Sequence, residues 1–376
     1  MPVIYLADFY AEMRLLRETR CKIISNIKSN QKPNHYDLRE LNNIEGRLTS
    51  IKKNDSLFQL KTHQDDEISL ELDYELGELQ KDKIFLEDGE DALLKHFEDL
   101  HPNFKNEVDK GVEFLKHQKF QHFITDRDGT VSNYCGRYQS SVQSIYNALF
   151  LSDFTKTVEG NSIIITSAPL YDIGLADISV QPKEDFILAG SKGRELIDQN
   201  GQKHEHTIKK DQQQKLDKLN SALKNLLKKD EYSSFRYIGS GLQFKFGQTT
   251  LARQDKNQSI PEKKSLNLKH EIEDLLKKLD PEKNYFRLED TGKDLEMILT
   301  VETGNKEFKE DFDKGDGFKF ITDQLNIKTQ NQKILICGDT ASDLPMIERA
   351  NDMQADVSSI FVTTDDTLKK EVKKLC

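Results

Sequence analysis

The sequence predicts an α/β protein built on a parallel sheet with helices on both faces. Three short apolar runs rich in β-branched residues, at 123–125, 162–166 and 333–337, alternate with helical stretches, as buried parallel strands do. Polar residues follow these runs directly, at the strand ends where such sheets bind ligands. A block of mixed helices and strands interrupts this core, and a helical region precedes it.

Residues 1–105 are predicted to form a helical accessory domain. Apolar residues recur at helical spacing between Tyr10 and Ile27 and again between Leu38 and Ile51. A further helix with its apolar face at 93–100 should stop before Pro102, and residues 69–72 fit either a short strand or more helix. The region carries no catalytic constellation, so self-association through its helices is the role it suggests.

Residues 106–184 and 309–376 are predicted to form the core, with a fourth strand at 360–362. Residues 185–308 are predicted to form an inserted α+β block. The elements expected in this block are strands at 186–190, 242–246, 249–253, 285–288 and 295–299 and helices at 216–226 and 266–279.

Composition narrows the classes of function. The chain has 376 residues and a net charge of 55 − 65 = −10, which disfavours a general nucleic-acid-binding role because a phosphate backbone calls for a basic face. No apolar run approaches the roughly 20 residues of a membrane span. The four cysteines lie far apart without CxxC spacing, which suits free thiols. We therefore expect a cytoplasmic protein that acts on neither nucleic acid nor membrane.

The segment Asp126-Arg127-Asp128-Gly129-Thr130 follows the first predicted strand. Two carboxylates at i and i+2 with a glycine next also occur in calcium loops, but the further ligands of an EF-hand are absent. A plain surface turn is the other alternative, since Asp-Gly is a common turn dipeptide. The first Asp is the candidate nucleophile and the second the candidate general acid and base.

A second acidic segment, residues 338–343, follows another strand and carries Asp339 and Asp343. Four acids at one sheet edge repel each other unless a cation lies among them. Oxygen ligands beside a phosphate favour Mg²⁺, so we predict a magnesium site formed by Asp126, Asp128, Asp339 and Asp343. Helix capping by Ser342 or Asp343 is the structural alternative.

Three further residues are candidate phosphate ligands. Thr166 and Ser167 end the triple-isoleucine strand and offer hydroxyl and backbone donors, although both could instead cap a helix. Lys314 precedes the helix that leads to the last strand, where a lysine can neutralise a phosphoryl group. A single lysine is usually ordinary surface charge, so this assignment depends on the other motifs.

The order of these motifs resembles the haloacid dehalogenase superfamily of phosphohydrolases. Residues 126–130, the strand ending in Thr166, Lys314-Gly315 and residues 338–343 carry the resemblance. It implies a Rossmann-like core. It also implies a cap of the C2 type inserted between the second and third motifs, where residues 185–308 lie.

Within that superfamily the chain is most similar to trehalose-6-phosphate phosphatases. Segments 189–196, 241–253 and 294–297 carry this finer resemblance, which implies that Arg194, Lys245 and Glu296 of the cap bind sugar. The sequence departs from the family pattern at Gln243, which stands where the family has an acid.

The resemblance implies Mg²⁺-dependent hydrolysis of a sugar phosphate through an aspartyl-phosphate on Asp126, with trehalose 6-phosphate favoured. It implies that Asp126, the main-chain carbonyl of Asp128 and Asp339 hold the ion, while Asp343 orients a metal-bound water or Lys314. Sucrose-phosphate, a glycosyl-3-phosphoglycerate and hexose phosphates stay open as substrates. A phosphomutase and a non-catalytic sugar-phosphate-binding protein are the alternatives from other classes.

Overall fold

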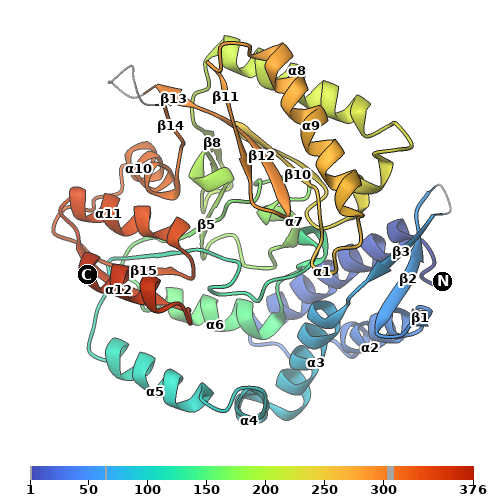
Figure 1. The fold of residues 1–376 in the computed structure, drawn as a ribbon. Coiled ribbons are helices and arrows are strands. Elements are labelled where there is room, and N and C mark those ends of the chain that lie inside the picture. Colours follow the sequence, from blue (N-terminus) through green and yellow to red (C-terminus); the bar gives the residue numbers. More distant parts are fainter. Residues whose placement is uncertain (1, 64–65, 303–308) are drawn as a thin grey trace.

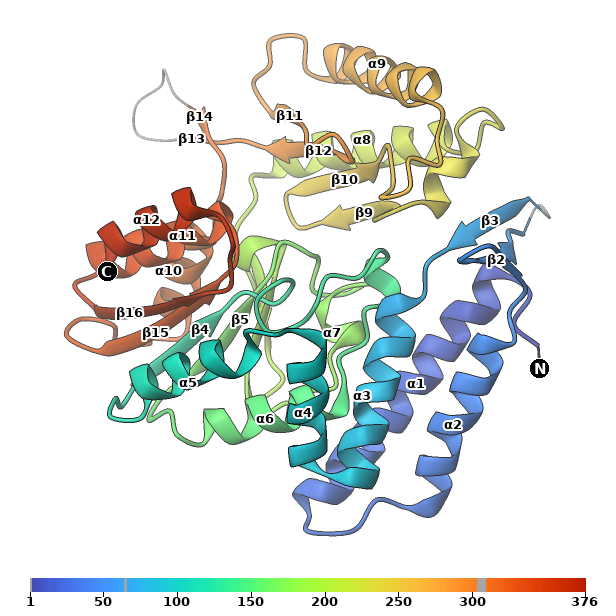
Figure 2. The same ribbon diagram turned by 60° about the horizontal axis from the view of Figure 1, so that its bottom comes forward.

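The computed structural model describes residues 2–63, 66–302 and 309–376. Figure 2 shows three parts: an N-terminal helical bundle at lower right, an α/β core at lower left and a cap above them. The core is a mostly parallel sheet with helices on both faces, so the predicted fold class is confirmed. No helix of these three ranges has the length and apolar character needed to cross a membrane.

The N-terminal region is mostly helical, as the spacing of its apolar residues predicts, and its helices form a bundle (Figure 1). Asn34 caps the second helix by accepting a hydrogen bond from the backbone N–H of Tyr36. Of residues 69–72, left open between strand and helix, Ser69 and Leu70 end a strand of a small antiparallel sheet that the sequence otherwise did not reveal, and residues 71–72 connect it to the next helix. The elements are α1 (Leu6–Lys28), α2 (His35–Thr49), β1 (Lys53–Asn54), β2 (Leu57–Lys61), β3 (Glu67–Leu70), α3 (Asp73–Asp88) and α4 (Glu90–Leu100).

The bundle packs on the core through a buried ion pair. Arg20 of α1 donates to Asp82 of α3 at 2.7 Å, and both side chains are almost fully buried. Asp82 also accepts from the backbone N–H of Ile145, which begins core helix α6 (Ile145–Thr155), at 2.7 Å. Arg20 donates in turn to the carbonyl oxygen of Val142 at 2.9 Å. The bundle therefore supplies the cap of a core helix, while self-association through its helices stays a prediction.

The core sheet has seven strands in the order β16-β15-β4-β5-β6-β7-β8. The first five are parallel, and Ile124 pairs with Ile336 on one side and with Ile163 on the other. Side chains alternate between faces, so Ile124 packs toward α10 and α11 whereas Phe123 packs toward α6. The five parallel strands are β4 (His122–Thr125), β5 (Ser162–Ile165), β6 (Ile187–Gly190), β15 (Lys333–Gly338) and β16 (Asp356–Phe361).

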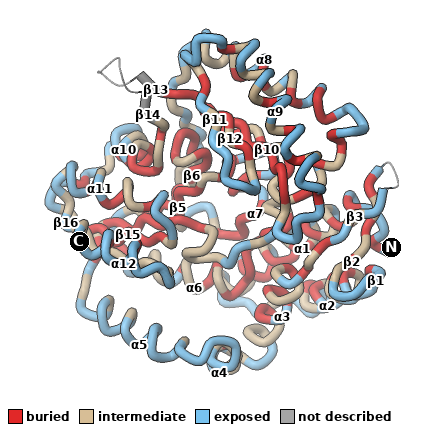
Figure 3. Tube along the Cα trace, in the orientation of Figure 1, coloured by how far each residue is buried: buried red, intermediate tan, exposed pale blue. Residues whose placement is uncertain are grey.

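Helices cover both faces of this sheet, and α4 and α5 lie at the exposed rim in Figure 3. The four cysteines are unpaired, as expected. The remaining elements outside the cap are α5 (Phe104–Leu115), η1 (Tyr138–Ser140), α7 (Leu175–Ile178), η2 (Ser191–Gly193), β13 (Val301–Glu302), β14 (Lys309–Glu310), α10 (Lys314–Gln324), η4 (Ala341–Asp343), α11 (Leu344–Asp352) and α12 (Asp366–Leu375).

The inserted block begins later in the chain than residue 185. Strand β6 pairs in parallel with β5, and β7 (Glu195–Ile197) and β8 (Lys203–Glu205) extend the same sheet in antiparallel fashion. Residues 187–205 thus belong to the core sheet. A short buried apolar run has the same sequence pattern in a core strand and in a cap strand. The sequence alone therefore did not show that residues 187–190 pair with the core sheet. The expected end at residue 308 lies outside the described residues.

The cap is a four-stranded antiparallel sheet in the order β11-β12-β10-β9, with two helices on one face. Leucines of both helices pack against Leu251, Leu295 and Met297 of the sheet. The opposite face turns toward the core. The elements are α8 (Lys210–Leu226), η3 (Ser233–Tyr237), β9 (Leu242–Lys245), β10 (Gln248–Ala252), α9 (Glu262–Leu279), β11 (Phe286–Asp290) and β12 (Asp294–Leu299).

Candidate active site

Sheet register brings the two acidic segments together. Cys337 of β15 lies beside Thr125 of β4, so the residues that follow these strands emerge at neighbouring strand ends. The backbone N–H of Asp126 donates to the carbonyl oxygen of Cys337 at 3.0 Å. This register, set by buried β-branched residues, fixes the spacing of Asp126 and Asp339.

Lys314 forms the centre of a buried charge cluster. Its Nζ lies 2.5 Å from Asp126 Oδ1 and 2.6 Å from Asp343 Oδ1. Burial raises the pKa of Asp126 to about 6, against the opposing effect of the Lys314 charge. Burial alone would lower the pKa of Lys314, but the two carboxylates outweigh it and raise that pKa. The three residues predicted from separate motifs therefore form one electrostatic unit.

Asp126, Asp339 and Asp343 could hold a metal ion, since each offers a carboxylate oxygen and these atoms all lie within 4.8 Å of one another. A set of hard oxygen donors fits Mg²⁺. Asp343 is also tied down locally, because its Oδ2 accepts from the backbone N–H groups of Asp339 and Thr340 at 3.0 and 3.1 Å. The capping alternative for Asp343 therefore applies to one of its oxygens, which orders the loop, while the other oxygen contacts Lys314.

The Asp128 carboxylate lies outside this cluster. It pairs instead with the guanidinium of Arg127, which is buried and also donates to the carbonyl oxygen of Ser141. The Asp128 carboxylate is therefore engaged by Arg127 and not by the acidic cluster, and the expectation that the main-chain carbonyl oxygen of Asp128 holds Mg²⁺ stays a prediction. The sequence did not single out Arg127, because nothing in the spacing of the motif signals a buried arginine between the two acids.

Gly129 lets the acidic loop close over Asp339. Its φ of +90° is costly for other residues, and an added Cβ would clash with the Asp339 carboxylate and with Tyr134. The Tyr134 hydroxyl donates to Asp339 Oδ2 at 2.7 Å. Thr130 Oγ1 reaches Asp126 Oδ2 at 3.3 Å, so the hydroxyl buttresses the loop.

Thr166 and Ser167 line the same cleft at the end of β5. The Thr166 side chain is buried, and its Oγ1 accepts from the backbone N–H of Ala168 at 3.3 Å. The hydroxyl therefore organises the strand end, in line with the capping alternative, while phosphate binding by Thr166 and Ser167 stays a prediction.

The cleft has a volume of about 690 Å³ and lies between core and cap. Gln243, Thr250 and Glu296 form a row across β9, β10 and β12, because Thr250 pairs with each of the other two. All three line the cleft, as does Lys245, two residues from Gln243 and therefore on the same face. Lys245 Nζ lies 4.0 Å from Glu296, and burial lowers the pKa of Lys245.

Arg194 lies elsewhere. Its buried guanidinium donates to the carbonyl oxygen of Gly247 at 2.8 Å and stacks over Phe312 at 4.7 Å. Burial lowers its pKa to about 10. Arg194 follows β6 of the core and binds the backbone of the cap hairpin, so it fastens the cap to the core and is not among the residues that line the cleft.

The bundle contributes a wall of the cleft that the sequence did not reveal. Residues 69–71 and 73–75 line it, and Glu71 accepts from Lys256 of the cap at 3.0 Å. Asp294 of β12 also faces the cleft and accepts from Ser240 at 2.6 Å. In the sequence, Asp294 could have been identified only from its position two residues before Glu296, because residues i and i+2 of a strand share a face.

The fold and the acidic cluster together define a haloacid-dehalogenase-type domain with a cap over the carboxyl ends of the core strands. A family model described as trehalose-6-phosphate phosphatase, C-terminal, matches residues 123–376. A second, described as the trehalose-6-phosphate phosphatase N-terminal helical bundle domain, matches residues 5–104. The chain belongs to the trehalose-6-phosphate phosphatase family.

The individual relatives share about 30% sequence identity or less with this chain. Alpha,alpha-trehalose-phosphate synthase (UDP-forming) 2 of Caenorhabditis elegans is 31% identical over 389 residues, covering 99% of this chain and 31% of the relative. The chain thus spans about a third of the length of the synthases it matches. The trehalose-phosphatase of Brugia malayi is 29% identical, covering 76% of this chain and 58% of the relative.

Among solved structures, the trehalose-6-phosphate phosphatase of Aspergillus fumigatus has 13% sequence identity and a TM-score of 0.38. The match covers 71% of this chain and 96% of that one.

Proposed function

We propose that this chain hydrolyses trehalose 6-phosphate to trehalose and phosphate with Mg²⁺ bound. The observation that carries the proposal is the buried cluster of Asp126, Lys314 and Asp343 beside Asp339, which faces a polar sheet of the cap. Such a cluster can bind a phosphoryl group and position a carboxylate to attack it. Family membership supports this chemistry.

In the proposed reaction the Asp126 carboxylate attacks phosphorus and forms an aspartyl-phosphate, and the bond from phosphorus to the sugar oxygen breaks. Asp128 gives its proton to that oxygen, and then takes a proton from the water that hydrolyses the intermediate. Arg127 engages only Oδ1 of Asp128, and no hydrogen bond within the described ranges engages Oδ2. We assign proton transfer to Oδ2.

The other core residues hold the phosphoryl group. Lys314 and Thr166 neutralise or hydrogen-bond its oxygens, since phosphoryl transfer depends on positioning and electrostatics. Mg²⁺ held by Asp126 and Asp339 would neutralise further charge on the same oxygens. Asp343 keeps Lys314 in place.

Recognition of the sugar falls to the cap. A disaccharide presents many hydroxyl groups, and Gln243, Lys245, Asp294 and Glu296 offer donors and acceptors on one side of the cleft. Lys256 and Glu71 connect cap and bundle at the rim, so the ion pair helps to close the site against water.

The test is a phosphate-release panel with trehalose 6-phosphate, sucrose 6-phosphate and glucose 6-phosphate in the presence of Mg²⁺. We expect preference for trehalose 6-phosphate, and a loss on the order of 10⁴-fold or more in Asp126→Asn. Asp88→Asn, at an exposed helix end, is the matched control and should keep full activity.

Each outcome separates the alternatives. Undiminished turnover in Asp126→Asn would exclude Asp126 as nucleophile, and preference for another ester would exclude trehalose 6-phosphate as the substrate. A requirement for a bisphosphorylated activator would indicate a phosphomutase. Binding without turnover in Mg²⁺ would indicate a non-catalytic protein.

A further inference from the structure

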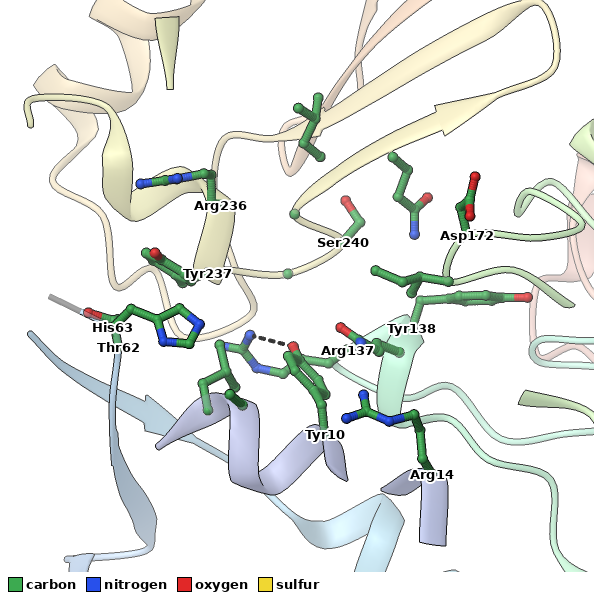
Figure 4. Close-up of a pocket in the computed structure, with 18 residues that line it drawn as sticks. Tyr10, Arg14, Thr62, His63, Arg137, Tyr138, Asp172, Arg236, Tyr237 and Ser240 are labelled. Carbon is green, nitrogen blue, oxygen red and sulfur yellow. Dashed lines mark hydrogen bonds between the residues drawn. The ribbon is translucent and has the colours of Figure 1, made fainter. Parts of the chain in front are cut away.

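A second pocket lies where bundle, core and cap meet (Figure 4). We call it the junction pocket. Its volume is about 320 Å³, at the lower end of the range for small-molecule sites. It is lined by residues of α1, of the β2–β3 connection, of two core loops and of the cap segment 236–243.

Three arginines from three parts of the molecule line the junction pocket. Arg14 comes from α1, Arg137 from the core loop after the acidic motif and Arg236 from the cap. Asp172 is the sole acid among the described lining residues, and none of the three arginines has an ion pair within the described part of the chain. The pocket therefore carries an excess of positive charge.

The arginines are accompanied by uncharged hydrogen-bonding groups. Tyr10 lies one helical turn before Arg14 on the same face of α1, and its hydroxyl accepts from Arg137 at 3.4 Å. In Figure 4 the labelled side chains of Arg14 and Arg137 lie close to Tyr10. Gly239 and Gly241 have positive φ angles of 46° and 63°, which bend the cap loop over the pocket.

Apolar side chains complete the lining, namely Leu6, Ile173 and Leu242. Clustered guanidinium groups bind phosphate oxygens through charge-assisted hydrogen bonds, and an apolar wall accommodates a carbon skeleton. We propose that the junction pocket binds a small phosphorylated organic molecule, such as a single sugar ring bearing phosphate, at a site separate from the catalytic cluster.

The junction pocket is distinct from the catalytic cleft but connected to it. Neither Asp126, Lys314 nor Asp339 lines it. The two sites share a wall formed by residues 137–138, 239–240 and 243. Within that wall Ser240 donates to Asp294, which faces the catalytic cleft. A ligand in the junction pocket lies between α1 of the bundle and segment 236–243 of the cap, beside that wall.

Binding is tested by calorimetry of the full chain without Mg²⁺, with glucose 6-phosphate as the probe and glucose as the neutral comparison. This measurement needs no turnover, and the comparison with a variant altered only in the junction pocket separates binding there from binding in the catalytic cleft. In the double variant Arg14→Gln/Arg236→Gln we expect binding at the junction pocket to weaken about tenfold or more, since each arginine supplies charge-assisted hydrogen bonds.

Both arginines are exposed, so their replacement should leave folding intact. Arg39→Gln, an exposed arginine of α2 outside the lining, is the control and should bind as the unaltered chain does. Amide hydrogen exchange should slow at 236–243 and at 6–14 in the presence of the probe. Equal isotherms for the chain and the double variant, equal binding of glucose, or no binding of millimolar glucose 6-phosphate would each overturn the proposal.

Discussion

On the core side of the catalytic cleft each charge is held by other charges, whereas on the cap side the charged groups have few partners. Lys314 contacts two carboxylates within 2.6 Å, and Asp343 also accepts backbone hydrogen bonds. Lys245 and Glu296 of the cap meet only at 4.0 Å, and neither side chain has a hydrogen bond among the described residues. The core side is thus ordered by its own ion pairs, while the cap side has unused hydrogen-bonding capacity; under the proposed function the first would serve the chemistry and the second the sugar.

The largest effect is expected from Lys314→Met. Loss of the ammonium group leaves the buried Asp126 and Asp343 facing each other, so kcat should fall by about 10²–10³-fold and the free energy of unfolding by about 3–5 kcal/mol. Steady-state kinetics and urea unfolding measure the two effects. Lys319→Met, an exposed lysine on the same helix, should change neither. An unchanged kcat would contradict the assignment of the chemistry to the core side of the cleft.

Arg20→Leu tests whether the bundle belongs energetically to the core. The substitution leaves the Asp82 carboxylate buried without its partner, so the free energy of unfolding should fall by about 3–5 kcal/mol. Arg47→Leu removes two partly exposed ion pairs within the bundle and should cost only about 1 kcal/mol. Equal losses of unfolding free energy in the two variants would mean that the buried pair stabilises the protein no more than the partly exposed pairs do.

A smaller effect, on recognition alone, is expected from Lys245→Met and from Glu296→Gln. Lys245→Met removes an ammonium donor, and Glu296→Gln replaces one carboxylate acceptor oxygen with an amide donor, so KM for the sugar phosphate should rise by about tenfold while kcat stays within about threefold. Lys277→Met, on an exposed helix of the cap, is the control. A fall in kcat that matches Lys314→Met would place these side chains in the chemistry instead.

The smallest effect concerns Asp290, a paired cap charge outside the cleft. Partial burial raises its pKa, but hydrogen bonds from Lys269 and Arg253 outweigh this and hold it at about 2. Because the pKa in the unfolded chain is about 3.9, the stabilisation is complete above that value and is lost as pH falls through about 2.

Asp290→Asn should therefore lower the free energy of unfolding by about 1 kcal/mol at neutral pH, with the difference vanishing near pH 2. Thermal unfolding of both chains across this range measures it, and turnover should not change. A difference that grows on acidification would contradict the sign of the pKa shift.

Residues that follow strands could be predicted from the sequence. Asp126, Thr166 and Asp339 end apolar runs of the core, and parallel pairing brings strand ends to one edge. Lys314 was harder, since its role depends on a helix that begins beside that edge. The local pattern was therefore enough to place Asp126, Thr166 and Asp339 at one edge of the sheet.

Contacts between distant segments could not be predicted in this way. Arg194 precedes a short strand of the core, and only the packed structure shows that it binds the cap backbone. The Glu71–Lys256 pair joins residues 185 apart in the chain, for which the sequence holds no periodic signal. The beginning of the cap was misplaced for a related reason, because pairing partners decide to which sheet Ile187–Gly190 belongs.

The Asp82 carboxylate at the start of α6 has a consequence for any shortened form of the chain. A fragment that began at β4 would keep every predicted catalytic residue, yet the first N–H groups of α6 would lose their acceptor and the carbonyl oxygen of Val142 its donor. These groups end the loop that carries Asp126 and Asp128. We therefore expect the bundle and the core to unfold together, although the chain divides into separate segments by its sequence pattern.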